Sequence, residues 1–415
     1  MSSQTLTLGL KRNPAWKPNG PMDYARSARK WNIAPTEQST FYMHDNTLMR
    51  RSESHQKEQE DSTLEGAILI TSDDGSIFGT KVPLGDVQND LEYVVPVAIG
   101  TPAITVSLDF DTASSDLWVW SSLLPTNVDR AGHNVYDPTR SSTAKQDLTL
   151  TWKIGFGDGS SASGLVYSDT ITLGGNLTVS NQAIEAAQNL SGSYLGESTS
   201  DGALGLAFPE INTVLPTRQA TPVENMISQK LISQPIFTVK LGKSDNDSFY
   251  TFGYIDESVT TNPITYATID SSNGLWEFSS PTLTIDGKVQ KRRSSKNTAI
   301  IDTATTLILL DDFACKAIYS SIHGAKLDLL QGGWVIPRTV DPRLLPDIGF
   351  AVEDTTYTLP GSDLIYTAGS HGTYFGSIQS RGLNPQDILG DVFLKRVYAV
   401  FDQTAGAPPI GFAQR

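Results

Sequence analysis

Residues 108–120 read Leu-Asp-Phe-Asp-Thr-Ala-Ser-Ser-Asp-Leu-Trp-Val-Trp. An apolar, strand-like approach brings Asp111 into a short run of hydroxyl-bearing residues, and a second apolar run follows. A similar stretch, Ala-Ile-Ile-Asp-Thr-Ala-Thr-Thr-Leu-Ile-Leu-Leu, occupies residues 299–310 and carries Asp302 at the matching place. If the two halves of the chain pack face to face, these carboxylates meet and can share one proton.

The two halves share more than the aspartate turn. Residues 203–205 read Ala-Leu-Gly and residues 388–390 read Ile-Leu-Gly. Gly205 lies 94 residues after Asp111, and Gly390 lies 88 residues after Asp302. The matched order and spacing predict an internal duplication in which each half contributes one aspartate.

Most of the chain has the pattern of short strands. The 415 residues are enough for a sizeable core. Short β-branched runs broken by Gly, Pro or Asp predict strands at residues 67–70, 93–100, 104–108, 148–154, 170–173, 236–241, 249–254, 276–285 and 396–401. From residue 66 onward, helices are expected only around residues 223–231 and 311–322, so the protein should be mostly β.

Composition excludes several classes of protein. A net charge of −14 disfavours nucleic acid or an anionic membrane as a partner, and no apolar run reaches the roughly 18 residues of a membrane span. The five His residues show no metal-ligand spacing, and no nucleophile-elbow or phosphate-loop motif occurs. We therefore expect neither a cofactor nor a metal. The single cysteine, Cys315, is expected to be a buried, inert thiol.

The first residues differ from the rest. Residues 1–60 contain nine Lys or Arg against six Asp or Glu, so the remaining 355 residues carry a net charge of −17. Residues 11–31 read as an extended strip followed by a short basic helix. The segment is either a prosegment docked electrostatically on the acidic body or a solvated charged tail. Arg50-Arg51, in a polar stretch, is a candidate cleavage point.

No apolar core of signal-peptide length occurs near Met1. An intracellular location is therefore expected for the chain as given, and secretion if a signal peptide has been removed.

Together these motifs resemble the pepsin-like aspartic proteases, especially the fungal branch of the aspergillopepsin and penicillopepsin type. The resemblance runs from about residue 10 to the last residue. It rests on residues 111–118, the flap-like Gly-Phe-Gly-Asp-Gly-Ser at 155–160, and residues 201–206, 252–256, 302–306 and 388–394.

The resemblance implies a mostly β, bilobal fold with a cleft between two β-lobes. The implied division is a prosegment-like leader over residues 1–75, an N-terminal lobe over 76–262 and a C-terminal lobe over 263–415. Asp111 and Asp302 would be the catalytic pair, activating a water against a peptide carbonyl and protonating the leaving nitrogen. The other implied site residues are Thr112, Ser114, Thr303 and Thr305 as support for the pair, and Phe156, Gly157, Asp158 and Trp118 as flap or substrate-binding residues. The implied partners are a peptide or protein substrate and the chain's own leader, and the implied assembly is a monomer.

Three departures from the family pattern bear on activity. Ala113 and Ala304 replace the family's glycines after Asp-Thr; alanine is tolerated there if φ is negative and costs on the order of 1 kcal/mol if φ is positive. Phe156 replaces the flap tyrosine and lacks its hydroxyl. Arg338 and Tyr374 stand at the expected cysteine positions of the second lobe's disulfide.

Three functions therefore stay open at this point. The first is an aspartic endopeptidase made as a zymogen. The second is an intracellular enzyme that uses the same pair for non-proteolytic acid-base chemistry, such as a cyclisation or condensation in fungal small-molecule biosynthesis. The third is an inactive, pepsin-shaped binding protein, against which the retention of both aspartates argues.

Overall fold

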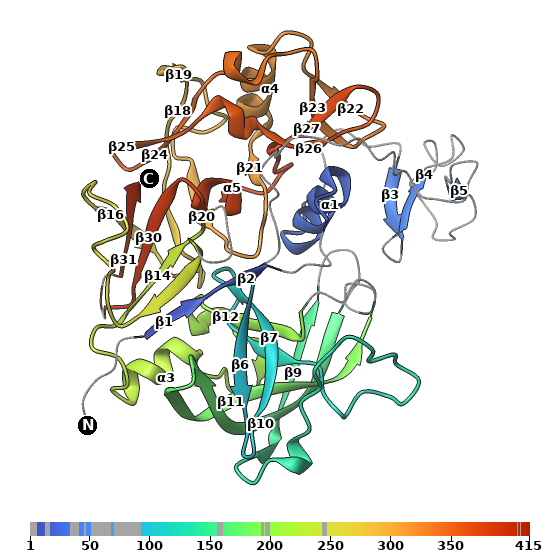
Figure 1. The fold of residues 1–415 in the computed structure, drawn as a ribbon, viewed down its shortest axis with the longest axis vertical. Coiled ribbons are helices and arrows are strands. Elements are labelled where there is room, and N and C mark those ends of the chain that lie inside the picture. The colour runs from blue at the N-terminus through green and yellow to red at the C-terminus, as the bar shows by residue number, and fades with distance from the viewer. Residues whose placement is uncertain are drawn as a thin grey trace.

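The structure is a computed structural model that describes residues 6–12, 17–33, 41–44, 47–50, 68–69, 93–155, 161–191, 195, 200–242, 247–404, 406 and 408–415. The flap residues Phe156, Gly157 and Asp158 lie outside the described residues, as does Arg51 of the candidate cleavage point. The described chain is mostly β-structure, as predicted, with β-rich halves on either side of helix α1 (Gly20–Lys30) (Figure 1).

A nine-stranded sheet forms the first half. Its order is β13-β9-β10-β11-β8-β12-β7-β6-β2. The bounds are β13 (Val214–Leu215), β9 (Lys145–Gly155), β10 (Ser161–Leu173), β11 (Leu177–Leu190), β8 (Leu117–Val119), β12 (Gly202–Gly205), β7 (Ile104–Asp111), β6 (Tyr93–Ile99) and β2 (Lys11–Arg12).

An eleven-stranded sheet contains most of the second half. Its order is β1-β15-β14-β30-β31-β16-β17-β20-β29-β21-β28. The bounds are β1 (Leu6–Gly9), β15 (Phe249–Phe252), β14 (Ile236–Lys240), β30 (Val397–Asp402), β31 (Pro409–Gln414), β16 (Thr265–Asp270), β17 (Glu277–Ser279), β20 (Thr298–Ile301), β29 (Asp387–Leu389), β21 (Ile308–Leu310) and β28 (Ile378–Ser380).

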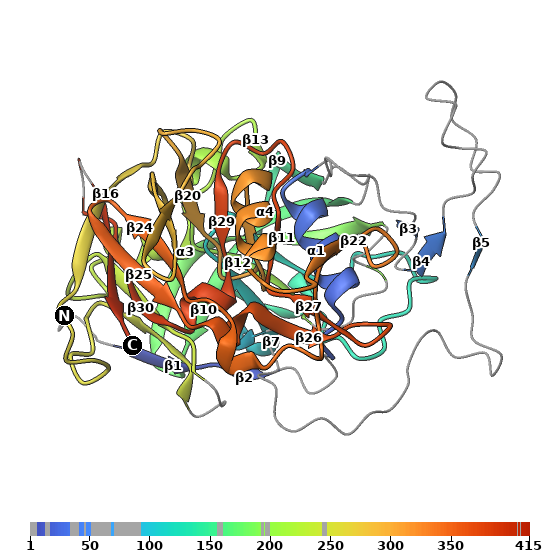
Figure 2. The same cartoon turned by 90° about the horizontal axis from the view of Figure 1, so that it is seen from above.

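Three smaller sheets complete the described strands. One pairs β19 (Lys288–Gln290), β18 (Leu283–Ile285), β24 (Ile348–Val352) and β25 (Thr355–Leu359). The next pairs β22 (Lys326–Asp328), β23 (Gly333–Pro337), β27 (Thr373–Gly376) and β26 (Ile365–Ala368). The last pairs β3 (Phe41–His44), β4 (Thr47–Arg50) and β5 (Ile68–Leu69) and stands beside the body in both views (Figures 1 and 2).

The α-helices of at least four residues in the described chain are α1, α3 (Pro222–Ser228), α4 (Asp312–Ser320) and α5 (Asp391–Leu394). The helices predicted after residue 66 correspond to α3 and α4, and the short basic helix predicted within residues 11–31 corresponds to α1. A capping box between Thr221 and Glu224 begins α3, and the Asp311 side chain caps α4. None of the helices in the described part of the chain is long and apolar enough to cross a membrane.

Strand β7 shows why the Asp111 stretch becomes a strand. Val106, Leu108 and Phe110 alternate along it, and each is at most 1% exposed. Alternate residues of a strand point to one face, so these three pack into the core and carry the chain to Asp111.

The predicted repeat is present in space. Strand β12 pairs in parallel with β7, with Gly205 opposite Asp111, and β29 pairs in parallel with β20 in the second half. The two glycines are required because each passes against the turn that follows an aspartate. A side chain on Gly205 would collide with the backbone of Ser115, and one on Gly390 would collide with the carbonyl oxygen of Thr305.

The single predicted strand over 276–285 is wrong. The structure has two strands there, β17 and β18, in different sheets. Pro281 lies between them, and proline has no N–H to continue a ladder. The predicted strand at 170–173 is the end of the longer β10, which pairs with β11 over most of its length.

Candidate active site

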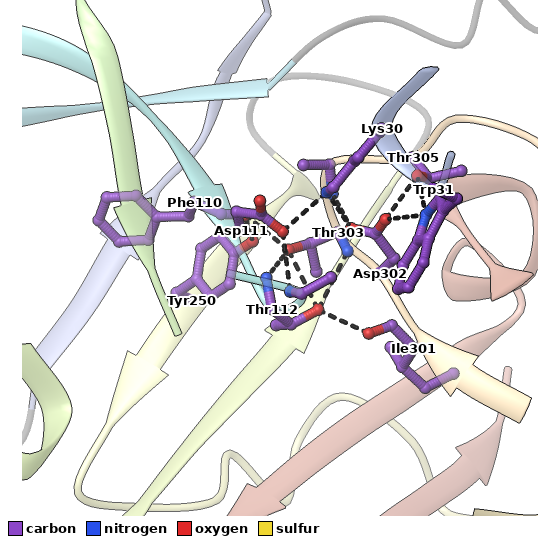
Figure 3. Close-up of polar contacts among 12 residues, drawn as sticks. Lys30, Trp31, Phe110, Asp111, Thr112, Tyr250, Ile301, Asp302, Thr303 and Thr305 are labelled. Carbon is purple, nitrogen blue, oxygen red and sulfur yellow. Dashed lines mark hydrogen bonds and ion pairs between the residues drawn. The ribbon is translucent and has the colours of Figure 1, made fainter. Parts of the chain in front are cut away.

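The two aspartates lie at the ends of strands from opposite halves. Asp111 ends β7 and Asp302 follows β20 directly; they are 7% and 0% exposed. The turns after them are tied together by reciprocal bonds: the Thr112 N–H donates to Thr303 Oγ1 and the Thr303 N–H donates to Thr112 Oγ1, both at 3.1 Å. Each hydroxyl also donates to a carbonyl of the opposite half, Thr112 to Ile301 at 2.8 Å and Thr303 to Phe110 at 2.6 Å (Figure 3).

Each aspartate is oriented by its own turn. The N–H groups of Ala113 and Ala304 donate to Asp111 Oδ1 at 2.8 Å and Asp302 Oδ1 at 2.9 Å. Neither alanine is among the residues with positive φ. The favourable alternative therefore holds at both positions: alanine adds a methyl group without backbone strain and keeps its N–H aimed at the carboxylate.

The predicted hydroxyl partners are also in place. Thr305 Oγ1 donates to Asp302 Oδ2 at 2.5 Å. The Ser114 hydroxyl hydrogen-bonds to Asp111 and lowers the pKa of that carboxyl. The four support residues predicted from the resemblance are thus gathered around the pair.

A lysine from helix α1 lies between the two carboxylates. Lys30 Nζ donates to Asp111 Oδ1 at 2.9 Å and to Asp302 Oδ1 at 2.8 Å. The next residue, Trp31, donates its indole N–H to Asp302 Oδ2 at 3.0 Å and lies 3.3 Å from Thr305 Oγ1 (Figure 3). Both aspartates therefore accept a hydrogen bond from the same ammonium group.

The electrostatics of the site are asymmetric. Burial by itself raises the pKa of Asp111, but the Lys30 charge and the hydrogen bonds to the carboxylate outweigh it, and the net pKa is lowered. Burial and the nearby Asp111 charge raise the pKa of Asp302, although Lys30 opposes them. Burial lowers the pKa of Lys30, and the two aspartates more than reverse this, so the ammonium stays charged.

A third carboxyl lies close behind the pair. Asp391 begins α5 and is 3% exposed, and no group among the described residues hydrogen-bonds to its Oδ1. Burial and the charges of Asp109 and Asp302 raise the pKa of Asp391 well above its usual range, which favours the protonated form of this carboxyl.

Comparison with known proteins places this chain in a family. Residues 92–415 match the family model described as eukaryotic aspartyl protease. The chain belongs to the eukaryotic aspartyl proteases. The two Asp-Thr-Ala turns lie within the matched range, whereas Lys30 and Trp31 lie outside it.

Several named fungal aspartyl proteases are similar to this chain. Aspergillopepsin-1 of Aspergillus pseudoglaucus is 43% identical over 335 residues, covering 80% of this chain and 81% of its own. Penicillopepsin-1 of Penicillium janthinellum is 42% identical over 327 residues, covering 78% and 95%. Endothiapepsin of Cryphonectria parasitica is 36% identical over 407 residues, covering 97% and 89%, so this match extends into the residues before 92.

Of the other predicted site residues, only Trp118 lies within the described residues. Trp118 is buried in β8, where its ring stacks on Trp152 with centroids 6.4 Å apart. The structure describes no group of three or more His, Cys, Asp or Glu side chains that could hold a metal ion.

The two expected cysteine positions are adjacent in space. The Arg338 guanidinium lies over the Tyr374 ring, 5.4 Å from its centroid, and Arg338 Nε donates to the Thr373 carbonyl at 2.9 Å. A cation–π contact thus joins the segments at this place. Cys315 is fully buried, and burial raises the pKa of its thiol well above the usual value, which fits the expected inert role.

Sequence reasoning missed Lys30 and Trp31. The net positive charge of residues 1–60 and the short basic helix expected within residues 11–31 indicated that the segment could dock, but charge alone does not tell which cation reaches the aspartates. The usable signal was position: Lys30 ends the helix, followed by a large aromatic residue, so both side chains project from one end of α1.

Proposed function

We propose that this protein is an aspartic endopeptidase whose leader holds it latent. Asp111 and Asp302 would activate a water for attack on a peptide carbonyl. The observation that carries the proposal is the Lys30 ammonium group bonded to both Oδ1 atoms. A single cation satisfies both carboxylates only where they converge on one point, and that point is where a nucleophilic water would be held.

Departure of Lys30 changes the charge of the pair. Two buried carboxylates that converge without a cation cannot both ionise at low cost, so one proton is retained between them. The ionised member can take a proton from the water as it attacks, and the protonated member can hydrogen-bond the carbonyl oxygen. The proton gained is then available to the leaving nitrogen, so one water is consumed for each peptide bond broken.

A peptide substrate is supported by what occupies the site. The group bonded to the pair belongs to a polypeptide whose helix packs on the second half of the protein. Tyr24 and Ile33 join an apolar cluster there with Leu307, Tyr366 and Phe375. A surface that receives one polypeptide beside the carboxylates suits extended peptides with apolar side chains.

The two alternatives use the same residues and are separated by experiment. A fold-retaining enzyme of small-molecule chemistry would keep the pair but would not cleave peptides. A binding protein would not need the pair. The geometry of Ala113 and Ala304 keeps both backbone donors in place, so these departures do not themselves favour loss of proteolysis.

The test is cleavage of a denatured protein substrate between about pH 3 and 6. Full-length wild type would be compared with Asp111→Asn and Asp302→Asn. A second comparison uses Lys30→Met, which removes the cation from the pair, and Lys17→Met, which removes the same charge from an exposed position in the leader.

We expect cleavage by wild type after acidification and at least a ~1,000-fold loss in each Asp→Asn variant. Lys30→Met should cleave without a prior acid step, because loss of a buried ion-pair partner weakens leader docking by about 3 kcal/mol, whereas Lys17→Met should behave as wild type. Absence of cleavage by Lys30→Met across the whole pH range, in a protein that is folded, would overturn the proposal.

A further inference from the structure

Two carboxyl side chains are buried together behind the Asp111 turn. Asp116 follows that turn, and Glu185 lies on β11 in parallel register with Trp118 of β8; both carboxyls belong to residues that are 1% exposed. One side-chain amide joins them. Asn212 Nδ2 donates to Asp116 Oδ1 at 2.9 Å and to Glu185 Oε1 at 3.1 Å.

The hydrogen bonds indicate where the proton of this pair lies. Asp116 Oδ1 also accepts from the backbone N–H of Thr213 at 2.8 Å and from its hydroxyl at 3.1 Å, as an ionised carboxylate would. Glu185 Oε2 is buried and receives no hydrogen bond from any donor in the described part of the chain. An ionised oxygen without a donor is costly in the interior, whereas a protonated one can itself donate to a neighbouring carboxylate. Glu185 and Asp116 are hydrogen-bonded to each other.

The surroundings favour the same assignment. Burial, and then the Asp116 charge, raise the pKa of Glu185 well above its usual range. Burial also raises the pKa of Asp116, although the hydrogen bonds from Thr213 lower it. The charge of Asp111, which lies outside the pair, raises the pKa of Asp116 further. The residues in register with Glu185 on the neighbouring strands, Val166 and Trp118, are uncharged.

The pair is connected to the catalytic turn through the backbone. Asn212 Nδ2 also lies 3.2 Å from the Ser115 carbonyl. The carbonyls of Asp116 and Ser114 accept from the N–H groups of Gly205 at 2.8 Å and Ala207 at 2.9 Å. A displacement of Asp116 therefore moves the segment that carries Asp111 and Ser114.

We propose that Glu185 is a positioning residue for the catalytic turn. Glu185 shares one proton with Asp116 and thereby holds the Asp111 segment in place. Loss of that proton as the pH rises releases the Asp111 segment. With both carboxyls ionised, two negative charges would face each other in the interior with one amide between them. The activity arm of the test rests on the proposed peptidase function, and the unfolding arm does not.

Glu185→Gln is the decisive variant, because its amide can accept from Asn212 and donate to Asp116 but cannot ionise. The matched control is Glu210→Gln, which makes the same substitution at an exposed residue of the same half. Full-length wild type and both variants would be unfolded thermally from pH 4 to pH 8. We expect the Tm of wild type and of Glu210→Gln to fall as the pH rises, and the fall to be at least halved in Glu185→Gln.

Cleavage assays add a readout that loss of packing alone would not produce. Glu185→Gln should keep kcat near wild type at about pH 4 and extend the alkaline limb of the pH profile by roughly one pH unit. Glu185→Leu, which leaves Asp116 without its proton donor, should lower kcat about tenfold with KM little changed. Parallel Tm profiles for wild type and Glu185→Gln would overturn the inference, as would an unaltered kcat in Glu185→Leu. Failure of all forms to cleave would count against the peptidase and leave the unfolding result decisive for the pair.

Discussion

At the scale of single residues, the site depends on small groups with fixed directions. Ala113 and Ala304 stand where a change from glycine could have disturbed the carboxylates, yet each keeps a backbone N–H within 2.9 Å of its aspartate. Their methyl groups are only partly buried. The cost of a side chain here depends on φ, and φ is not positive at either residue.

Restoring glycine at both positions should therefore do little for catalysis. Ala113→Gly and Ala304→Gly should each lower the unfolding free energy by about 0.4–1 kcal/mol, because glycine gives the unfolded chain more freedom. We expect kcat/KM on a peptide substrate to stay within roughly threefold of wild type. A gain of more than tenfold in the double variant would show that the methyl groups obstruct the site. Chemical denaturation and steady-state kinetics provide the two measurements.

At the scale of elements, helix α1 is built to end at the aspartates. Asn19 caps its first turn, where the Asn19 side chain accepts from the Met22 N–H, and Arg29 and Lys30 lie in its last turn, where positive charge is favourable. Gly20 passes directly over the Phe375 ring, where any side chain would collide. Tyr24 donates to the Ser380 carbonyl at 2.7 Å. These contacts set the rotation of the helix and hence the direction of Lys30.

The docking of α1 should depend on pH through two carboxyl groups whose pKa values shift in opposite directions. Asp23 is buried against the Tyr366 hydroxyl at 2.6 Å, beside Arg26, and burial raises the pKa of Asp23 to about 6. Its contribution to docking is present below its ordinary pKa and is lost as the pH rises through about 6. The pKa of Asp111 is lowered in the docked state, so its contribution is present above its ordinary pKa and is lost as the pH falls through the lowered value.

Docking should therefore be tightest at mildly acidic pH and weaken on both sides. Hydrogen exchange of the α1 amides, corrected for the intrinsic pH dependence, would measure it. Asp23→Asn should abolish the weakening between pH 5 and 7 and leave the acid limb intact, whereas the exposed Asp147→Asn should change neither limb. An unchanged neutral limb in Asp23→Asn would contradict the assigned role of Asp23.

At the scale of the whole molecule, two strands near the start of the chain, β1 and β2, belong to different large sheets. Strand β1 lies at the edge of the eleven-stranded sheet beside β15, and β2 lies at the edge of the nine-stranded sheet beside β6. Leu6, Leu8 and Leu10 are each at most 6% exposed and join the main core cluster. The segment therefore joins the two sheets and covers the aspartates at the same time.

Truncation of one of these leucines should weaken the whole fold. Leu8→Ala should lower the unfolding free energy by about 2–5 kcal/mol, since a buried leucine is replaced by a cavity. Thr7→Ser, on the outward-facing side of the same strand, should change it by less than about 0.5 kcal/mol. Equal denaturation midpoints for Leu8→Ala and wild type would show that β1 does not contribute to cooperative stability.

The sequence by itself determined the strand-rich class, the two aspartate turns and their repeat. These depend on local pattern: alternating apolar residues, Asp-Thr turns, and glycines at matched distances from each aspartate. The resemblance to the pepsin-like proteases, rather than the local pattern, implied that Thr112 and Thr303 support the pair.

Only the tertiary structure decided which groups surround the carboxylates. Lys30 reaches them from 81 residues before Asp111, and Asn212 joins Asp116 to Glu185 across three separate segments. Such contacts depend on how sheets and helices pack, and no local sequence pattern encodes which residues far apart in the chain meet. The φ of Ala113 and Ala304 was likewise open in the sequence, since a backbone angle in a turn is set by the strands and hydrogen bonds that hold the turn from both sides.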